Sequence, residues 1–130
     1  MNVPTEICQT TSQKRKRVLI VDDFAWIREN LNETLDGVPE LEVVGQAKDG
    51  EQALMAIQEL QPDIITLDIH MPKMNGLRLL ERIRHWPCEV IVFTGLTSAF
   101  HKERCLELGV EHFFDKITEF DQFLDTLKAI

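Results

Sequence analysis

Residues 18–23 have the sequence VLIVDD, in which four apolar, mostly β-branched residues are followed by two aspartates. A short, continuous apolar run of this kind is typical of a strand that is buried on both faces, as in a parallel sheet. The spacing then changes, because Ile27, Leu31 and Leu35 lie four apart and predict a helix with one apolar stripe. This start predicts an α/β fold.

The same alternation of strand and helix continues to the end of the chain. Asp49 is a plausible N-cap, Gly109 is a good residue for the left-handed conformation after a helix, and Thr118 with Asp121 resembles a capping box for the last helix. Five strands that alternate with five helices predict a doubly wound parallel sheet covered on both faces. Further strands are predicted at residues 41–47, 64–68, 90–94 and 112–114, and further helices at about 49–60, 77–85, 98–108 and 118–130.

Length and composition predict one cytoplasmic domain. The chain has 130 residues, of which 44% are hydrophobic and 28% charged, and no apolar run approaches the roughly 20 residues that cross a bilayer. We expect a flexible N-terminal extension at residues 1–13 and one domain at residues 14–130. The net charge of −8 argues against nucleic-acid binding by the folded body. The three cysteines show no CxxC spacing and are expected to be reduced thiols.

Polar side chains follow the predicted strands at the points where those strands end. Asp22 and Asp23 follow the first strand, Asp68 ends the third, Thr94 ends the fourth, and Lys116 follows the fifth. Functional groups of an open parallel sheet gather beyond the carboxyl ends of its strands. Two carboxylates about 4 Å apart repel by roughly 4 kcal/mol at an effective dielectric near 20, so three together require a cation. Oxygen ligands suit Mg²⁺, or Mn²⁺ in its place.

Four blocks of the sequence together resemble the receiver domains of response regulators. They are VLIVDD at 18–23, LDIHMPKMNG at 67–76, the pair Thr94-Gly95, and Lys116. The resemblance covers residues 17–130 in the family's order and spacing. It implies a (βα)5 flavodoxin-like, CheY-like fold with strand order 2-1-3-4-5, and a role as a two-component signalling receiver.

The resemblance also implies roles for the acidic residues. Asp68 would be the phosphoacceptor, which attacks a phosphohistidine or a small phosphodonor. Asp23 and Asp68 would bind Mg²⁺ directly, with the backbone carbonyl of His70 as a third protein ligand. Asp22 would act on the metal through water.

The resemblance implies that the remaining blocks contact the phosphoryl group and take part in the conformational change on activation. Lys116 would pair with the phosphoryl oxygens, and Thr94 would donate a hydrogen bond to one of them. Gly95 would leave room for the phosphate, while Met71-Pro72 and Gly76 would shape the loop after the third strand. On activation Thr94 would move toward the phosphate and Phe113 would turn inward behind it, unless Phe113 only fills the core.

Three positions depart from the usual family pattern. Ile117 stands where proline usually follows the lysine, so we expect a trans peptide and a rearranged loop there. The side chain of His70 could tune how water reaches the acyl phosphate, or it could be a solvent-exposed imidazole with no kinetic role. Phe113 replaces a tyrosine and brings no hydroxyl.

Several alternative functions compete with the phosphoacceptor hypothesis. A pseudo-receiver that only binds partners would not need the complete acidic, threonine and lysine set. A flavodoxin-like cofactor binder would need a Ser/Thr/Gly-rich loop after the first strand, and a dehalogenase-type phosphatase would need a DxD pattern there.

Expected partners are a sensor histidine kinase or histidine phosphotransfer protein and an unknown downstream protein. We expect no nucleic acid, no membrane, and a monomer or weak dimer. A stand-alone output is favoured over an excised receiver of a DNA-binding regulator.

Overall fold

The computed structural model describes residues 15–130, so the expected extension at residues 1–13 lies outside the described residues. Five parallel strands form one sheet in the order β2-β1-β3-β4-β5, as the resemblance implied. The strands are β1 (Lys16–Val21), β2 (Leu41–Ala47), β3 (Ile64–Leu67), β4 (Glu89–Thr94) and β5 (His112–Asp115). The helices are α2 (Ala25–Asp36), α3 (Gly50–Leu60), α4 (Gly76–Ile83), α5 (Ala99–Glu107) and α6 (Phe120–Ala129).

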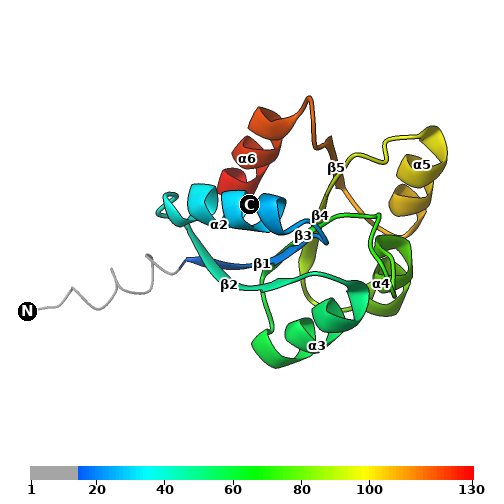
Figure 1. Cartoon of the computed structure of the whole chain (residues 1–130), viewed down its shortest axis with the longest axis horizontal. Helices are drawn as coiled ribbons and strands as arrows, with labels where there is room; N and C mark the ends of the chain where they lie inside the picture. The colour runs from blue at the N-terminus through cyan, green and yellow to red at the C-terminus, as the bar shows by residue number, and fades with distance from the viewer. Residues whose placement is uncertain (1–14) are drawn as a thin grey trace, which may run out of the picture.

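The helices cover both faces of the sheet, which confirms the doubly wound prediction. In Figure 1, α2 and α6 lie on one side of the sheet, and α3, α4 and α5 lie on the other. Alternate residues of β1 point to opposite faces: Leu19 and Val21 join the core under α3, α4 and α5, while Val18 and Ile20 join the core under α2 and α6. All four are at most 1% exposed, which explains the unbroken apolar run in the sequence.

Two of the three predicted helix-end signals are confirmed, and one is wrong. Asp49 caps α3, because its Oδ1 accepts a hydrogen bond from the Gln52 amide at 2.8 Å, and Gly109 has a left-handed φ of +94°. The capping box of Thr118 does not form. The last helix begins later, at Phe120, after an N-cap, Glu119, that makes no side-chain capping bond.

The physical reason is a hydrogen-bonded loop before α6. The Asp115 carboxylate accepts from the amides of Ile117 and Thr118, and the Glu119 carboxylate accepts from the Asp115 amide at 2.8 Å. These bonds hold residues 115–119 as a turn and leave Thr118 outside the helix. No peptide bond within residues 15–130 is cis, so the peptide before Ile117 is trans as predicted.

Two glycines allow the loop between β3 and α4 to pack closely against neighbouring backbone. A Cβ added to Gly50, at the start of α3, would lie 2.2 Å from the backbone oxygen of Met74. A Cβ added to Gly76 would lie 2.6 Å from the backbone oxygen of Asp68. Only glycine permits backbone approach this close. The same loop contains Lys73 with a φ of 63°. Among the described residues, no helix is both long and apolar enough to cross a bilayer.

Candidate functional site

The predicted acidic residues meet at the carboxyl edge of the sheet, the edge formed by the last residues of the strands. Asp22 and Asp23 follow β1, and Asp68 follows β3, whose last residue pairs with Val21 of β1. Asp22, Asp23 and Asp68 each place one carboxylate oxygen within 4.8 Å of the others. The third strand ends one residue before the predicted Asp68, whose amide still donates to the carbonyl of Val21 at 3.0 Å.

Thr94 and Lys116 face into the same cluster. The hydroxyl of Thr94, the last residue of β4, donates to Oδ1 of Asp68 at 2.8 Å. The ammonium of Lys116 lies 2.6 Å from Oδ2 of Asp22 and 3.4 Å from Oδ2 of Asp68. The backbone amide of Lys116 donates to the Thr94 carbonyl, which holds the loop after β5 against β4. The structure therefore brings together all five residues that the strand ends predicted.

Burial makes this cluster electrostatically costly. Asp22 is 2% exposed and Asp68 5% exposed, whereas Asp23 is exposed. Burial raises the pKa of the Asp22 carboxyl, and the nearby Asp68 charge adds to this, while hydrogen bonds from Lys116 and the Phe24 amide oppose it. Three carboxylates and one ammonium leave two negative charges uncompensated within the cluster.

The donor set fits a divalent, oxygen-preferring cation. Both oxygens of Asp22 already have partners, since Oδ1 accepts from the Phe24 amide at 2.9 Å and Oδ2 meets Lys116. The exposed carboxylate of Asp23 makes no hydrogen bond or ion pair within residues 15–130 and is free to act as a ligand. A site with one or two direct carboxylates and open positions for water is the kind that Mg²⁺ takes.

The other predicted site residues lie around this cluster. His70 is exposed in the loop after β3. A Cβ added to Gly95 would meet nothing within 4 Å, so the space above this residue is open. Phe113 is half-buried against the core under α3, α4 and α5, with Lys102 Nζ 5.8 Å from the centre of its ring. Phe114 points to the opposite face, where it contacts Phe123 edge-on, as strand alternation predicted.

Two contacts at the site were not predicted from the sequence. The shorter contact of Lys116 is with Asp22 rather than Asp68. Arg28 Nη1 also donates to the backbone carbonyl of Asp22 at 2.7 Å. A basic residue in the second turn of the helix that follows the strand was the only sequence signal for this contact.

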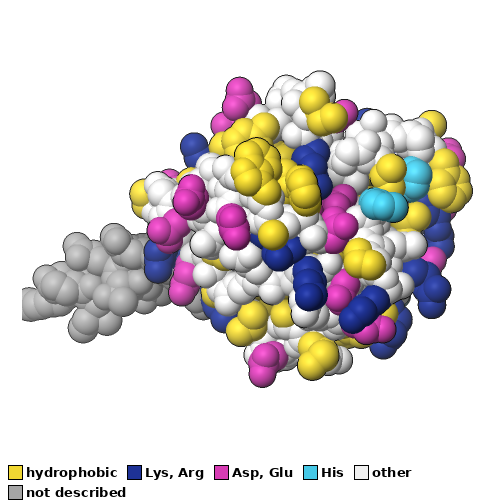
Figure 2. All heavy atoms as spheres, viewed as in Figure 1, with side chains coloured by type: hydrophobic (Ala, Val, Ile, Leu, Met, Phe, Trp, Pro, Cys, Tyr) yellow, Lys and Arg dark blue, Asp and Glu magenta, His cyan; other side chains and the backbone are white. Residues whose placement is uncertain are grey.

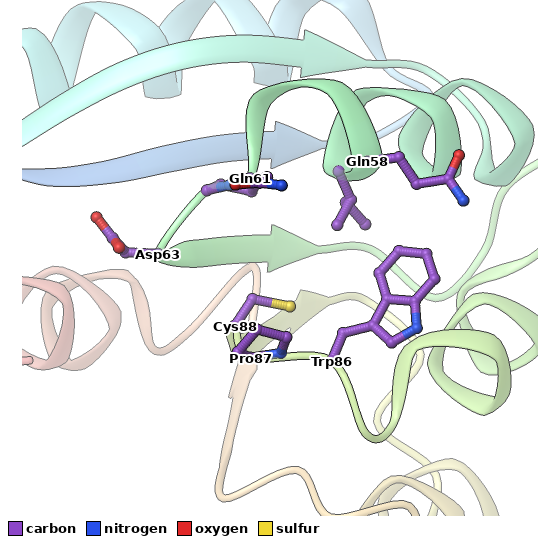
Figure 3. Close-up of a pocket in the computed structure, with 8 residues that line it drawn as sticks. Gln58, Gln61, Asp63, Trp86, Pro87 and Cys88 are labelled. Atoms are coloured by element: carbon purple, nitrogen blue, oxygen red, sulfur yellow. The ribbon is translucent and has the colours of Figure 1, made fainter.

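A cavity in the described part of the chain lies away from the cluster, at the opposite edge of the sheet. We call this the amino edge, because it is formed by the first residues of the strands. Figure 3 shows Trp86, Pro87 and Cys88, which precede β4, facing Gln58 and Gln61 at the end of α3. The cavity measures about 460 Å³. The sequence analysis did not predict it, because it depends on how a helix end meets a distant loop.

Comparison with known proteins places the chain among signalling domains. The family described as "Response regulator receiver domain" matches residues 18–128. The "Protein-glutamate methylesterase/protein-glutamine glutaminase" of Pyrococcus abyssi is 42% identical over 106 residues, which are 79% of this chain and 29% of that protein. The "Protein-glutamate methylesterase/protein-glutamine glutaminase 2" of Carboxydothermus hydrogenoformans is 44% identical over 103 residues, which are 77% of this chain and 29% of that protein. The chain thus spans less than a third of the length of these relatives.

Solved structures give the same result for the fold. The response regulator domain of Thermotoga maritima CheB superposes with a TM-score of 0.81 at 35% identity, covering 89% of this chain and 96% of that one. A chain of the CheX-CheY-BeF3-Mg²⁺ complex from Borrelia burgdorferi superposes with a TM-score of 0.81 at 28% identity, covering 93% of this chain and 92% of that one. The chain therefore belongs to the response regulator receiver family and is a receiver domain of two-component signal transduction.

Proposed function

We propose that Asp68 is the residue that accepts the phosphoryl group. One observation carries this proposal: Asp68 is the carboxylate that both the Thr94 hydroxyl, at 2.8 Å, and the Lys116 ammonium, at 3.4 Å, approach. Asp22 and Asp23 lie beside it. Phosphoryl transfer depends mainly on positioning and on charge neutralisation, and these neighbours provide both.

In the proposed reaction a carboxylate oxygen of Asp68 forms a bond to phosphorus. The bond from phosphorus to the imidazole nitrogen of a phosphohistidine breaks, and the imidazole leaves with the electron pair and takes up a proton. The product is an acyl phosphate on Asp68 and a free histidine on the donor. Lys116 would pair with the phosphoryl oxygens, and Thr94 would turn its hydroxyl from Asp68 to one of them.

The two uncompensated charges of the cluster support a divalent cation. Asp23 and Asp68 would hold Mg²⁺, or Mn²⁺, with the backbone carbonyl of His70, and Asp22 would act through water because its own oxygens are engaged. When bound, the cation neutralises the carboxylates and the phosphoryl oxygens. Gly95 would leave the approach to Asp68 open, since its surroundings are empty within 4 Å of an added Cβ.

The signal would leave the site through the fifth strand. Movement of Thr94 toward the phosphoryl group would vacate space behind it, and Phe113, half-buried on β5, would turn into that space. The surface of α5, β5 and α6 would then change shape as a shift between two populations. The His70 side chain is exposed, and its proposed role in tuning the access of water to the acyl phosphate stays a prediction.

The proposed phosphodonor is a histidine kinase or a histidine phosphotransfer protein. Figure 2 shows exposed hydrophobic side chains gathered over the region of α2 and α6. Phe24 and Trp26, 60% and 62% exposed, follow the acidic pair, and Ile117, 84% exposed, follows Lys116. Phe24 and Ile117 thus lie within two residues, along the sequence, of the two members of the Asp22–Lys116 ion pair. Exposed apolar groups beside a reactive site suit a protein donor.

Intact mass after incubation with acetyl phosphate and Mg²⁺ tests the proposal. The wild-type chain should gain one phosphoryl group, which Asp68→Asn should lose completely and Asp36→Asn, at an exposed aspartate on α2, should retain. An adduct that survives in Asp68→Asn would contradict the assignment. No adduct with acetyl phosphate or with any phosphohistidine donor would favour the alternative of a receiver that only binds partners.

For the output, we propose two alternatives. The stand-alone role expected from the sequence stays a prediction. The 42% identity to a methylesterase/glutaminase, of which this chain matches 29%, favours a receiver that controls an enzymatic partner or neighbour of that class. Beryllofluoride with Mg²⁺ mimics the phosphorylated state, so binding of the treated protein to a methylesterase catalytic domain would support the second proposal, and absence of binding would contradict it.

A further inference from the structure

The amino edge of the sheet carries a second group of ionisable side chains that the phosphoryl chemistry does not use. Glu89 is the first residue of β4, His112 is the first residue of β5, and Glu111 directly precedes His112. Each offers one ligand atom within 4.8 Å of the other two. We propose that Glu89, Glu111 and His112 form a binding site for a divalent transition-metal ion of the Zn²⁺ class.

The imidazole of His112 sets this group apart from an ordinary acidic patch. Mg²⁺ and Ca²⁺ prefer all-oxygen ligands, whereas an imidazole with carboxylates suits Zn²⁺ and its neighbours in the first transition series. Three protein ligands with a position left for water is a common zinc arrangement. Glu89 and Glu111 also contribute to the lining of an open cavity of about 240 Å³, which lies on the α4 side of the sheet.

The spacing of the ligand atoms supports a shared cation. His112 Nε2 lies 3.6 Å from Oε2 of Glu89, which is too long for a hydrogen bond. Two atoms that each bind a tetrahedral zinc at about 2.0–2.2 Å lie about 3.4 Å apart. The imidazole and the carboxylate therefore face each other at nearly the separation that a zinc ion between them requires.

No lysine or arginine within residues 15–130 neutralises the carboxylates of Glu89 and Glu111. Within residues 15–130, neither carboxylate forms an ion pair with a lysine or an arginine. Arg84 lines the same cavity, but its guanidinium lies beyond ion-pair distance of both. Glu89 and His112 are half-buried, so the glutamate carboxylates remain accessible to a cation from solvent.

The backbone at the site is fixed by the sheet. The Glu89 amide donates to the Asp63 carbonyl at 2.9 Å, and β4 pairs with β5 from Ile91 and His112 onward. By strand alternation, Glu89 points to the same face as Ile91, and His112 to the same face as Phe114, which is the α2 and α6 face for both. A metal here would join the first residues of two adjacent strands, one of which is the edge strand of the sheet.

Zinc titration by calorimetry, in millimolar Mg²⁺ to occupy the acidic cluster, tests the proposal. We expect one Zn²⁺ to bind, with affinity reduced at least tenfold in His112→Gln and in Glu89→Gln. His85→Gln is the matched control, because His85 is exposed and belongs to no such group, and its affinity should equal that of the wild type. The unfolding midpoint should rise with Zn²⁺ in the wild type and in His85→Gln only.

Other results would overturn the site. Zinc binding that is unchanged in His112→Gln but lost in Cys88→Ser would assign the metal to a thiol. Binding lost in Asp23→Asn would assign it to the acidic cluster. Circular dichroism and the metal-free unfolding midpoint verify that each variant is folded, and in a folded wild-type chain no binding at micromolar Zn²⁺ would exclude the proposal.

Discussion

The two edges of the sheet both collect carboxylates, but they hold them in opposite ways. At the carboxyl edge Asp22 and Asp68 are 2% and 5% exposed, and each has defined partners in Lys116 or Thr94. At the amino edge Glu89 is half-buried and Glu111 exposed, and neither has a lysine or arginine partner among residues 15–130. Both line a cavity there. One edge is closely packed around its charges, and the other is open.

This difference shows how one fold separates reactivity from accessibility. Buried and oriented charges interact strongly because little water screens them, so they can act on a phosphoryl group. Half-exposed charges interact weakly with each other and remain available to ions and ligands from solvent. The chemistry proposed at the carboxyl edge therefore requires closely packed loops, whereas the amino edge can accommodate cavities.

The largest expected contrast tests whether the amino edge is open. Cys88 lines the cavity there and is half-buried, whereas Cys105, beneath α5, is 0% exposed and burial raises the pKa of its thiol to about 11. Burial also raises the pKa of Cys88. At pH 8 iodoacetamide should alkylate Cys88 on the order of 100 times faster than Cys105, because the thiolate is the reactive form. Peptide mass mapping measures both rates.

The pH dependence has a definite sign. Between about pH 9 and 11 the unfolded chain loses the Cys105 proton while the folded chain keeps it, so this thiol lowers the stability of the fold as the pH rises through that window. Labelling of Cys105 in the folded protein should stay slow below pH 11. Equal rates for both cysteines at pH 8 would contradict the closed packing beneath α5.

A second prediction concerns the repulsion within the carboxyl edge. Mg²⁺ at about 100 times its dissociation constant should raise the free energy of unfolding by about 2.7 kcal/mol, because only the folded chain brings the carboxylates together. Asp23→Asn should remove most of this gain, and Asp121→Asn, on exposed α6 surface, should keep it. Urea unfolding with and without Mg²⁺ measures the effect. A gain of the same size in Asp23→Asn would argue against a metal at this edge.

A third prediction tests how tightly the carboxyl edge is packed. Gly76→Ala should destabilise the fold by about 1–3 kcal/mol, since the new Cβ would lie 2.6 Å from the Asp68 backbone oxygen. Gly95→Ala, at the same edge but with nothing within 4 Å, should change stability by less than about 0.5 kcal/mol. Thermal unfolding of the two variants gives the comparison. An equal loss of stability in the two variants would mean that the loop after β3 accommodates an added methyl group as easily as the loop after β4.

The smallest effect is expected at the amino edge. Gln61 ends α3 in the left-handed conformation, with a φ of 49°, so Gln61→Gly should stabilise the fold by up to about 1 kcal/mol. Gln58→Gly, inside the same helix and lining the same cavity, should destabilise it by about 1 kcal/mol. Chemical denaturation resolves the two signs. A loss of stability in Gln61→Gly would show that its side chain contributes more than the backbone strain costs.

The sequence predicted the sheet and the acidic cluster because both follow from local rules. Apolar runs set the strands, and parallel strands bring their last residues to one edge, so Asp22, Asp68 and Thr94 had to meet. The helix cap at Asp49 and the left-handed Gly109 were predictable for the same reason, since each depends on neighbouring residues alone.

What the sequence did not predict depends on contacts between distant segments. The Thr118 capping box was wrong because the Asp115 and Glu119 carboxylates bind the loop amides instead. The preference of Lys116 for Asp22 depends on the fold of that loop. The group of Glu89 with His112 arises only when β4 pairs with β5, two segments more than twenty residues apart.

The contact between Gly50 and the Met74 backbone has a mechanical consequence. It presses the first turn of α3 against the loop after β3, and Lys73 adds a second attachment by reaching the buried Asp49 at 3.9 Å. The first turn of α3 and the loop after β3 are therefore expected to move together. A Cβ added to Gly95, directly after β4, would instead meet nothing within 4 Å. The two loops that border Asp68 and Thr94 therefore differ in packing, and the loop after β3 is the one in which a larger side chain would have to displace backbone.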